Sequence, residues 1–429
     1  MPTLRGWLVA ATGVAVLLCG VGFGALAVQQ LGFALVALLG IALLVVRRGR
    51  FSLAATRTVT PRRARPSQAV EIELAISNRG RGAAPLLLLE DHLPPGLSGS
   101  GRFALQGIEP SGDRTASIPL RPARRGRYAI GPLEISVVDP FGLARVTRRA
   151  VDTDDLLVHP KIEPLMLPRD LGERRSMSTS ALRQLTGARG EDFYTLREYV
   201  EGDDLRRVHW SSTAKRGRYM IRQEETPWHT RATVILDDRP AAHDGVGGGS
   251  SFERAVGAAA SLVDLYYRSG YGFSLGTAHG HGIAGSRGTE HYNRCLDFLA
   301  TVEPPRATPG DDALLLRLQE VERGATTEAA FVLVTGSLAA SEAVAVARCA
   351  RRFRQVTVVG FPAHRFGTAS SRARWDGERQ VVEATRLMAR AQVRSIVLGP
   401  DESFGAAWAA SSLPGRGGET AWAPRAEPV

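Results

Sequence analysis

The chain has 429 residues, 44% of them hydrophobic, and a formal net charge of +11. This length exceeds one ordinary domain, and this composition is rich enough to bury cores, so an intrinsically disordered chain is excluded. The charge comes almost entirely from arginine, because only Lys161 and Lys215 are lysines, and such a bias fits genome composition. The arginines spread along the whole chain and are not interleaved with aromatic residues, so we expect no nucleic-acid binding.

The first 50 residues carry two apolar runs that predict membrane-spanning helices. Residues 7–28 are apolar throughout, about the length that crosses a bilayer, and a second run covers residues 31–46. The connecting pair Gln29-Gln30 is uncharged, whereas arginines flank the outer ends of the two runs: Arg5, Arg47, Arg48, Arg50 and Arg57. The positive-inside rule then places both ends in the cytoplasm. We therefore expect residues 1–50 to form a transmembrane helical hairpin in the cell membrane, with the lipid bilayer as a partner and the body of the chain in the cytoplasm.

A cleaved signal peptide is the alternative for this segment, because Ala25-Leu26-Ala27 resembles a cleavage site. Cleavage would leave the second apolar run and place the body outside the cell. Cysteine usage favours the cytoplasm, since Cys19 lies in the first run and Cys295 and Cys349 form no Cys-x-x-Cys pair. This spacing indicates neither a disulfide framework nor a thiolate metal site.

Residues 55–161 show the pattern of a small β-sandwich. The segment "AVEIELAISN" (69–78) alternates apolar and polar residues, and further short strands follow, separated by glycine and proline. Strands at such spacing are typical of a sandwich. No residue here indicates catalysis, and the isolated His92 and His159 are predicted to be surface residues.

Residues 231–402 alternate between short apolar strands and longer helices. The strand "ATVILD" (232–237) is followed by an amphipathic helix that ends at Gly270, and four more strands and several helices follow. This order predicts an α/β domain with a parallel, doubly wound sheet. We expect residues 162–230 to be a linker with a distinctive segment, and residues 403–429 to be a flexible tail.

The distinctive segment is "REYVEGDDLRRVHWSSTAKRGRYMIRQEE" (197–225), in which acidic residues run into basic ones. Asp203 or Asp204 is predicted to cap a helix that ends at Gly217, and a strand leading towards the α/β sheet should follow. Two roles remain open for its side chains. They form either an ion-pair network at a domain junction or a docking surface around Trp210. The candidate residues are Arg197, Glu198, Tyr199, Gly202, Asp203, Asp204, Arg206, Arg207, His209 and Trp210.

The segment "GEDFYTLREYVEGDDLRRVHWSSTAKRGRYMIRQEE" (190–225) resembles the core signature of the domain of unknown function 58 family. Upstream, "DHLPPGL" (91–97), "RRGRYAIGPLEISVVDPFGL" (124–143) and "LLVHPKI" (156–162) are similar to the family's β-domain. His209 stands where many relatives carry an aspartate, so an acidic role cannot be transferred to it. The resemblance implies a von Willebrand factor type A-like α/β domain. It also implies two partners, a MoxR-type AAA+ ATPase and a transglutaminase-like membrane protein.

Type A domains hold Mg²⁺ with an Asp-x-Ser-x-Ser loop, a distant threonine and a later aspartate. Here Asp237 is in place, but Arg239 and Ala241 replace the two serines, so an arginine brings a cation where one was to bind. The later strand ends in Thr335-Gly336 where the aspartate is expected. We therefore expect a degenerate site without Mg²⁺ and no cofactor. A residual metal site would rest on Asp237 together with Asp238 or Asp244.

Other patterns give little chemistry. The run "GVGGGS" (245–250) lacks the lysine of a phosphate-binding loop, and His279, His281 and His291 have no obvious carboxylate partner for zinc. No nucleophile motif is present in the sequence. We therefore expect a non-enzymatic, membrane-anchored adaptor that assists assembly or maturation of envelope-associated proteins. The alternative is a hydrolase-like envelope enzyme that uses residues 197–225, with acid–base chemistry at Asp203, Asp204 and His209.

Overall fold

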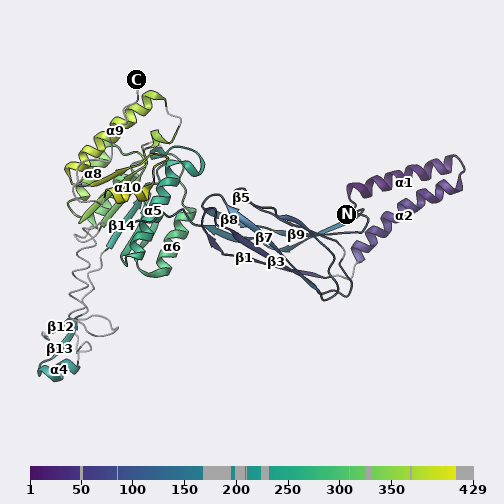
Figure 1. Ribbon diagram of the computed structural model, residues 1–429, viewed down its shortest axis with the longest axis horizontal. Coiled ribbons are helices and arrows are strands. Elements are labelled where there is room, and N and C mark those ends of the chain that lie inside the picture. Colours follow the sequence, from purple (N-terminus) through teal and green to yellow (C-terminus); the bar gives the residue numbers. More distant parts are fainter. Residues whose placement is uncertain are drawn as a thin grey trace. The chain divides into compact units, whose positions relative to one another are not determined.

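The structure is a computed structural model of the whole chain, shown in Figure 1. It divides into two units, Met1–Lys161 and Ile162–Val429, and each is described by itself. The described residues are 1–48, 52–84, 86–167, 195–198, 208, 210–223, 231–308, 310–324, 330–367 and 370–411.

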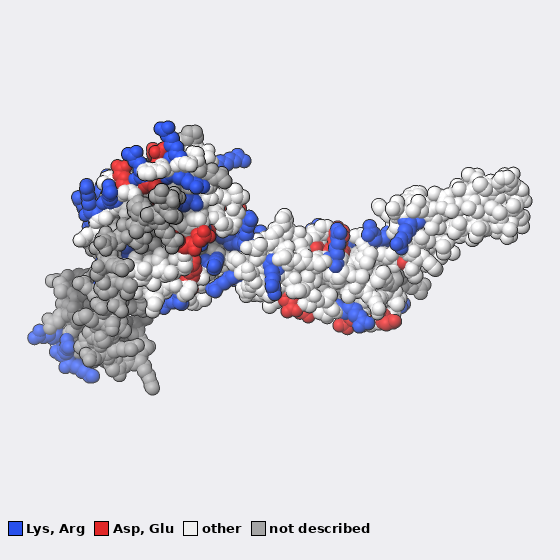
Figure 2. Space-filling model, turned by 45° about the horizontal axis from the view of Figure 1, so that its top comes forward, with Lys and Arg blue, Asp and Glu red and all other residues white. Residues whose placement is uncertain are grey.

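Two apolar helices open the first unit, α1 (Leu4–Gly22) and α2 (Leu26–Arg48), and both are long and apolar enough to cross a membrane. On the face drawn in Figure 2, the outer part of this hairpin carries no charged side chain. The helices pack through glycines: a Cβ on Gly32 would lie 2.5 Å from the backbone nitrogen of Leu17, so a small residue is needed for this close approach. The turn lies between Gly22 and Leu26 and not at the predicted Gln29-Gln30. Gln29 lies within α2, and its side-chain amide donates to the Gly20 carbonyl.

The remainder of this unit is β-sandwich-like, as predicted. Its sheets have the strand orders β1-β3-β7-β5, β10-β9-β4-β6 and β2-β11-β8. Alternation in β3 buries Val70, Ile72, Leu74 and Ile76 in a core shared with β4, β9 and β11. The strand bounds are β1 (Leu53–Thr60), β2 (Arg63–Ala64), β3 (Val70–Asn78), β4 (Leu87–Asp91), β5 (Leu97–Ser98), β6 (Arg102–Leu105), β7 (Asp113–Pro122), β8 (Gly126–Ile130), β9 (Leu133–Val138), β10 (Arg145–Val151) and β11 (Asp154–Val158).

A buried arginine joins the edges of these sheets. The side chains of Arg57 and Asp91 are both 0% exposed, and the Arg57 Nη1 donates to Asp91 Oδ1 at 3.0 Å. Arg57 also donates to the carbonyls of Ile130 and Asp152. Its Nε lies 3.2 Å from Asp154 Oδ2, within ion-pair distance but without hydrogen-bond alignment among the described atoms. Burial raises the pKa of the Asp91 carboxyl, and the charge of Arg57 opposes that rise.

Two sequence predictions are corrected in this unit. Arg57 was grouped with the arginines that flank the membrane, but its charge is used inside the sandwich-like body because Asp91 and two carbonyls surround it. His159 was predicted on the surface, yet it is only 7% exposed, because it directly follows the central strand β11. His92 is exposed as expected.

The α/β unit contains one sheet of six strands in the order β16-β15-β14-β17-β18-β19. Five strands are parallel as predicted, whereas the edge strand β16, which the sequence analysis did not anticipate, is antiparallel to β15. One core packs α5, α6 and α10 on the sheet, and a second core packs α7, α8 and α9 on it. The strands are β14 (Arg231–Leu236), β15 (Gly272–Thr277), β16 (Gly282–Ser286), β17 (Ala330–Thr335), β18 (Gln355–Gly360) and β19 (Arg394–Val397).

The helices of this unit alternate with the strands as predicted, and the last helix extends the unit to Ala410. They are α5 (Ser251–Arg268), α6 (Gly288–Thr301), α7 (Ala313–Arg323), α8 (Ala340–Cys349), α9 (Ser371–Arg390) and α10 (Phe404–Ala410). Helix α9 begins at residue 371, because the Ser370 hydroxyl accepts a hydrogen bond from the Ala373 amide and caps the helix.

Two predicted boundaries differ from the structure. Residues 404–410 were placed in the tail, but they form α10, whose Phe404 and Trp408 are each 2% exposed. The Trp408 indole donates to the Met166 carbonyl at 2.8 Å, and Leu165 lies in the same core. Residues 162–167 therefore belong to the α/β unit and not to the linker, because apolar burial fixes them there.

The signature segment contributes a hairpin and a short helix. The predicted strand is present as β13 (Met220–Gln223), which pairs antiparallel with β12 (Thr195–Glu198). Helix α4 (Trp210–Arg216) ends at Gly217, whose φ of 67° and N–H bond to Thr213 confirm the predicted stop. The helix begins at Trp210, later than the predicted caps Asp203 and Asp204, which lie outside the described residues.

Replacing Arg57 by alanine should destabilise the sandwich-like body, because Asp91 would remain buried without its cation. The expected loss is about 3–5 kcal/mol in the free energy of local opening. It can be measured by amide hydrogen exchange of β1 and β4 peptides in the detergent-solubilised chain. Arg127→Ala is the control, since its ion pair with Asp155 is exposed and its loss should leave exchange nearly unchanged. Equal effects in the two variants would contradict this role of Arg57.

Candidate functional site

The carboxyl ends of β14 and β17 form the candidate site. The chain passes from β14 to β15 on one side, while β17 lies on the other side of β14, so the strand order reverses between β14 and β17. Ligands of open α/β sheets bind at such a switch point. Asp237 follows β14 directly, and Thr335 is the last residue of β17. Both are 0% exposed, and the Thr335 hydroxyl donates to Asp237 Oδ2 at 2.7 Å.

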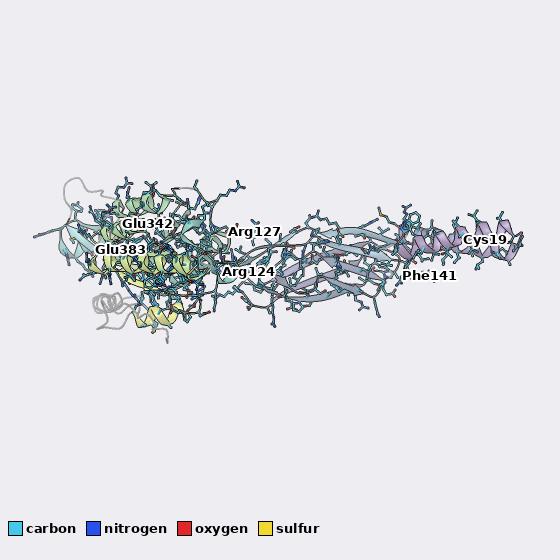
Figure 3. All side chains as sticks on the ribbon, turned by 90° about the horizontal axis from the view of Figure 1, so that it is seen from above. Cys19, Arg124, Arg127, Phe141, Glu342 and Glu383 are labelled. Carbon is cyan, nitrogen blue, oxygen red and sulfur yellow. The ribbon has the colours of Figure 1, made fainter. Side chains whose placement is uncertain are left out.

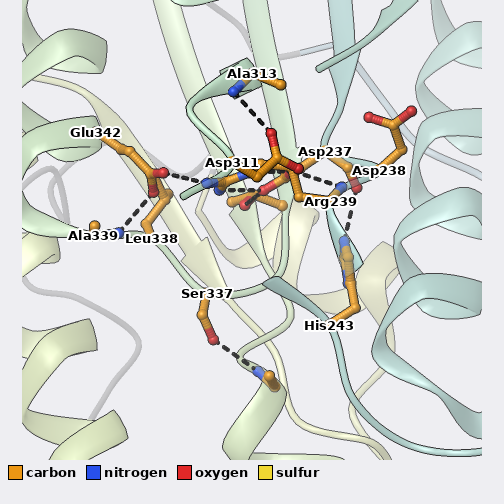
Figure 4. Close-up of polar contacts among 12 residues, drawn as sticks. Asp237, Asp238, Arg239, His243, Asp311, Ala313, Ser337, Leu338, Ala339 and Glu342 are labelled. Carbon is orange, nitrogen blue, oxygen red and sulfur yellow. Dashed lines mark hydrogen bonds and ion pairs between the residues drawn. The ribbon is translucent and has the colours of Figure 1, made fainter. Parts of the chain in front are cut away.

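Arg239 fills the space beside Asp237. Its Nε and Nη2 donate to the two oxygens of Asp237, each at 2.9 Å, which makes a bidentate pair. Its Nη1 donates to Glu342 Oε1 from the first turn of α8 (Figure 4). The other oxygen of Glu342 accepts from the Ala339 amide at 2.8 Å, so Glu342 also caps its helix. We call Asp237, Arg239 and Glu342 the Arg239 triad.

The Arg239 triad is a buried ion cluster in which one cation contacts two carboxylates. Exposure is 0% for Asp237, 8% for Arg239 and 5% for Glu342. Burial disfavours the charge of Arg239, but hydrogen bonds and attraction from Asp237 and Glu342 outweigh it and raise the pKa of the guanidinium. The guanidinium therefore remains a permanent internal cation between two carboxylates.

His243, from the loop after β14, contacts the backbone of Asp237. Its Nε2 lies 2.8 Å from the Asp237 carbonyl, which only accepts, so Nε2 carries the proton. Its Nδ1 accepts from the Ser251 hydroxyl at 3.1 Å. Burial lowers the pKa of His243, with Asp237 opposing that effect and Arg239 adding to it. The imidazole is thus held neutral in one tautomer.

A second cluster, the His279 triad, consists of Asp238, His279 and Asp311. The Nδ1 of His279 lies 2.8 Å from Asp238 Oδ1, and its Nε2 lies 3.0 Å from Asp311 Oδ2. Both ring nitrogens face carboxylates, so the charged imidazolium is favoured. Burial opposes this charge, but Asp238 and Asp311 outweigh it and raise the pKa of His279. The ring is 21% exposed, so this triad reaches the surface.

The predicted metal ligands do not converge. Asp238 turns to His279, and Asp244 accepts from the Gly245 amide rather than joining Asp237. Within the described ranges, no group of three or more His, Cys, Asp or Glu side chains is arranged to hold a metal ion. The Arg239 guanidinium already contacts Asp237, the carboxylate on which a residual site would have depended.

The other sequence candidates also separate. His291 is buried and donates to the Phe273 carbonyl, whereas His281 is exposed. The glycine run forms a short 3₁₀ turn, Gly247–Gly249. The Ser250 hydroxyl accepts a hydrogen bond from the Glu253 amide at the start of α5. That amide is therefore occupied within the chain.

The signature residues are only partly described. Tyr199, Gly202, Asp203, Asp204, Arg206, Arg207 and His209 lie outside the described residues, and Arg197 and Glu198 are described only as backbone of β12. Trp210 is 68% exposed and meets Tyr219, which is 54% exposed, edge to face at 6.3 Å between ring centroids. Lys215 and Arg216 occupy the exposed last turn of α4. The described residues of this set belong to β12 and α4, and their roles stay predictions.

Sequence reasoning missed Glu342 and Asp311. Glu342 follows Ala339 by three residues at the start of a helix, which is the spacing of a capping residue. No local pattern reveals that its second oxygen meets Arg239, 103 residues earlier. Asp311 lies two residues before α7 and accepts from the Ala313 amide, and its partner His279 comes from the turn after β15.

Comparison with known proteins supports the family resemblance of the signature segment. Residues 195–360 match the family model described as "Protein of unknown function DUF58". The chain is thus similar to the DUF58 family over this segment. It is similar to the uncharacterized protein YeaD of Bacillus subtilis, with 23% identity over 268 residues, 59% of this chain and 62% of the relative. The chain thus spans about three fifths of that relative's length.

Solved structures give only distant likenesses. A CARDB domain from Pyrococcus furiosus aligns with 26% of this chain and 90% of its own, at 14% identity and a TM-score of 0.20. A FixG-related protein from Vibrio parahaemolyticus aligns with 25% of this chain and 96% of its own, at 9% identity and a TM-score of 0.17. Scores this low carry no argument about fold or function.

Arg239→Ala should loosen the carboxyl edge of the sheet, since Asp237 and Glu342 would lose their shared cation inside the protein. We expect a loss of about 3–5 kcal/mol in local opening free energy, read from hydrogen exchange of β14 and β17 peptides. The matched control is Arg317→Ala, which breaks a more exposed pair with Glu320. Unchanged protection of β14 in Arg239→Ala would refute a structural role for the triad.

The two histidines should give the α/β unit opposite pH responses around the ordinary histidine pKa of about 6.5. The raised pKa of His279 contributes stability that is complete below that value and is lost as the pH rises through its folded pKa. The lowered pKa of His243 contributes stability that is complete above that value and is lost as the pH falls. The melting temperature of His279→Gln should therefore fall less than that of the unmodified chain as the pH rises. The melting temperature of His243→Gln should fall less as the pH is lowered. Identical pH profiles in both variants would contradict this assignment.

Proposed function

We propose that this chain is a membrane-anchored interaction protein that serves a MoxR-type AAA+ ATPase, with its body in the cytoplasm. A transglutaminase-like membrane protein is the second proposed partner. Support for the anchor comes from the length and apolar composition of α1 and α2. Support for the cytoplasmic side comes from the arginines at the outer ends of both helices. The ATPase is the partner implied by the family resemblance.

The α/β unit is proposed to be a von Willebrand factor type A-like domain with an internal cation. In its favour, the strands follow the doubly wound order with an antiparallel edge strand, and Asp237 directly follows the first of them. Arg239 then takes the position of the divalent ion between Asp237 and Glu342. Partner binding by such a domain would not depend on a divalent cation at this position.

The observation that carries the interaction role is the exposed aromatic pair of the signature segment. Trp210 and Tyr219 expose 68% and 54% of their surfaces while their rings contact each other. Exposed tryptophan and tyrosine beside cationic side chains are typical anchors of protein interfaces. Lys215 and Arg216 lie in the last turn of the same short helix. A partner surface with an apolar pocket and an acidic rim would match this set.

Partner capture with a topology test checks the proposal. A tag after Val429 should be protected from protease in right-side-out vesicles, and crosslinking in the same preparation should capture the ATPase. Trp210→Ala should reduce capture at least about tenfold, as loss of an interface anchor does. Trp375→Ala is the matched control, because Trp375 is also exposed, at 72%, but lies on α9.

Three outcomes would count against the proposal. An accessible tag would place the body outside the cell and remove the ATPase as a partner. Equal capture by the Trp210 and Trp375 variants would remove the aromatic pair from the interface. A signature variant that keeps its partner but loses a measurable turnover would favour the envelope-enzyme alternative.

A further inference from the structure

A rigid turn, residues 139–143, presents an exposed aromatic side chain from the sandwich-like body. Asp139 is 3% exposed and its carboxylate accepts from the amides of Phe141, at 2.9 Å, and Ala144. The Gly142 amide donates to the Asp139 carbonyl at 2.9 Å, and Gly142 has a φ of 71°, which suits glycine. Phe141 nevertheless remains 66% exposed. The turn is thus held in shape from within and directs an aromatic ring away from the core.

This 139–143 turn lies directly against the base of the helical hairpin. The Thr3 amide donates to the Leu143 carbonyl at 2.9 Å, and the Thr3 hydroxyl donates to the Gly142 carbonyl at 2.6 Å. A Cβ on Gly6 would lie 2.1 Å from the Leu143 carbonyl oxygen, so only glycine permits this approach of α1. Leu143 and Ala144 are buried in one small core with the last turns of α2, through Leu39, Ala42 and Val46.

The base of the hairpin has the residues of a membrane–water interface. Arg5 and Arg47 are exposed there, and Trp7 is 63% exposed one turn into α1. Arginine and tryptophan gather where spanning helices leave the hydrocarbon region. Figure 3 shows Phe141 at the end of the sandwich-like body that meets α1 and α2, with Arg124 and Arg127 at its other end.

The turn can approach lipid without burying a charge. Pro140, Phe141, Gly142 and Leu143 are uncharged, and the charge of Asp139 is turned inward onto two backbone amides. A phenylalanine at the boundary between headgroups and acyl chains removes apolar surface from water. The next charged residue, Arg145, is exposed and would remain at the headgroup level.

We propose that the 139–143 turn is a third membrane contact, in which Phe141 enters the boundary between headgroups and acyl chains beside α1 and α2. The occupant of this surface is the lipid bilayer itself. The inference rests on the proposed membrane anchoring and goes beyond it, because it fixes how the sandwich-like body faces the bilayer. Two helices alone leave that body free to tilt, whereas a third contact away from their axis restricts it.

Fluorescence quenching by nitroxide-labelled lipid tests this contact in the full chain reconstituted in phosphatidylcholine vesicles. Phe141→Cys in a Cys19→Ser background is labelled with an environment-sensitive dye, since Cys295 and Cys349 are buried. The control is Arg124→Cys, an exposed position at the opposite end of the same body. We expect quenching by a nitroxide near the headgroup to be several times greater at position 141 than at position 124.

Because the label replaces the phenylalanine, a second measurement keeps that side chain. Hydrogen exchange of the peptide containing residues 139–145 should be slower in vesicles than in detergent, and Phe141→Ser should reduce this difference, while β3 peptides report an intact fold. Resistance of the chain to carbonate extraction is measured in parallel. Equal quenching at positions 141 and 124 in a carbonate-resistant chain overturns the third contact alone. Extraction by carbonate overturns the anchoring on which it rests.

Discussion

The guanidinium of Arg239 is the charge on which the carboxyl edge of the α/β sheet depends. It balances Asp237 at the end of the first strand and Glu342 at the start of α8, so one side chain connects the loop after β14 to the helix after β17. Separation of either carboxylate from it would leave a buried ion without its counter-charge, which costs several kcal/mol. The edge where doubly wound sheets bind ligands is therefore occupied from within. Next to it, the His279 triad repeats the arrangement of one cation between two carboxylates, but at the surface and under the control of pH.

The sandwich-like body uses the same device in a different place. Arg57 lies inside it and meets Asp91 and two backbone carbonyls, so its charge holds strands from more than one sheet. In both units an arginine therefore supplies a permanent cation where the backbone and the carboxylates leave a polar gap. Arginine suits this use because its planar fork donates several hydrogen bonds and it keeps its charge when buried. Part of the arginine content of the chain is thus structural, and part is left on the surface.

The membrane end of the first unit and the signature segment serve the proposed interaction role in different ways. At the membrane end, Thr3, Gly6 and Leu143 join the first turn of α1 to the body by backbone contacts, which couples the anchor to the sandwich. In the signature segment, Trp210 and Tyr219 are 68% and 54% exposed, and their rings contact each other edge to face. The proposed interaction role needs both features, apolar helices joined to the sandwich-like body and an exposed aromatic pair.

The sequence by itself determined the elements whose patterns are local: two apolar helices, alternating strands from residue 55, strand–helix alternation from residue 231, and the helix stop at Gly217. It also indicated that Arg239 brings a cation to the loop after Asp237. Only the tertiary structure decided which groups meet. Glu342 and Asp311 carry ordinary helix-start patterns, and their second partners lie far away in the sequence. Likewise, the sequence pattern indicates a membrane-flanking charge at Arg57 and a tail at Phe404 and Trp408, whereas all three are buried. Burial depends on neighbours that no local pattern reveals. Propensity and periodicity act over a few residues, whereas charge balance and core membership are set by the packing of the whole unit.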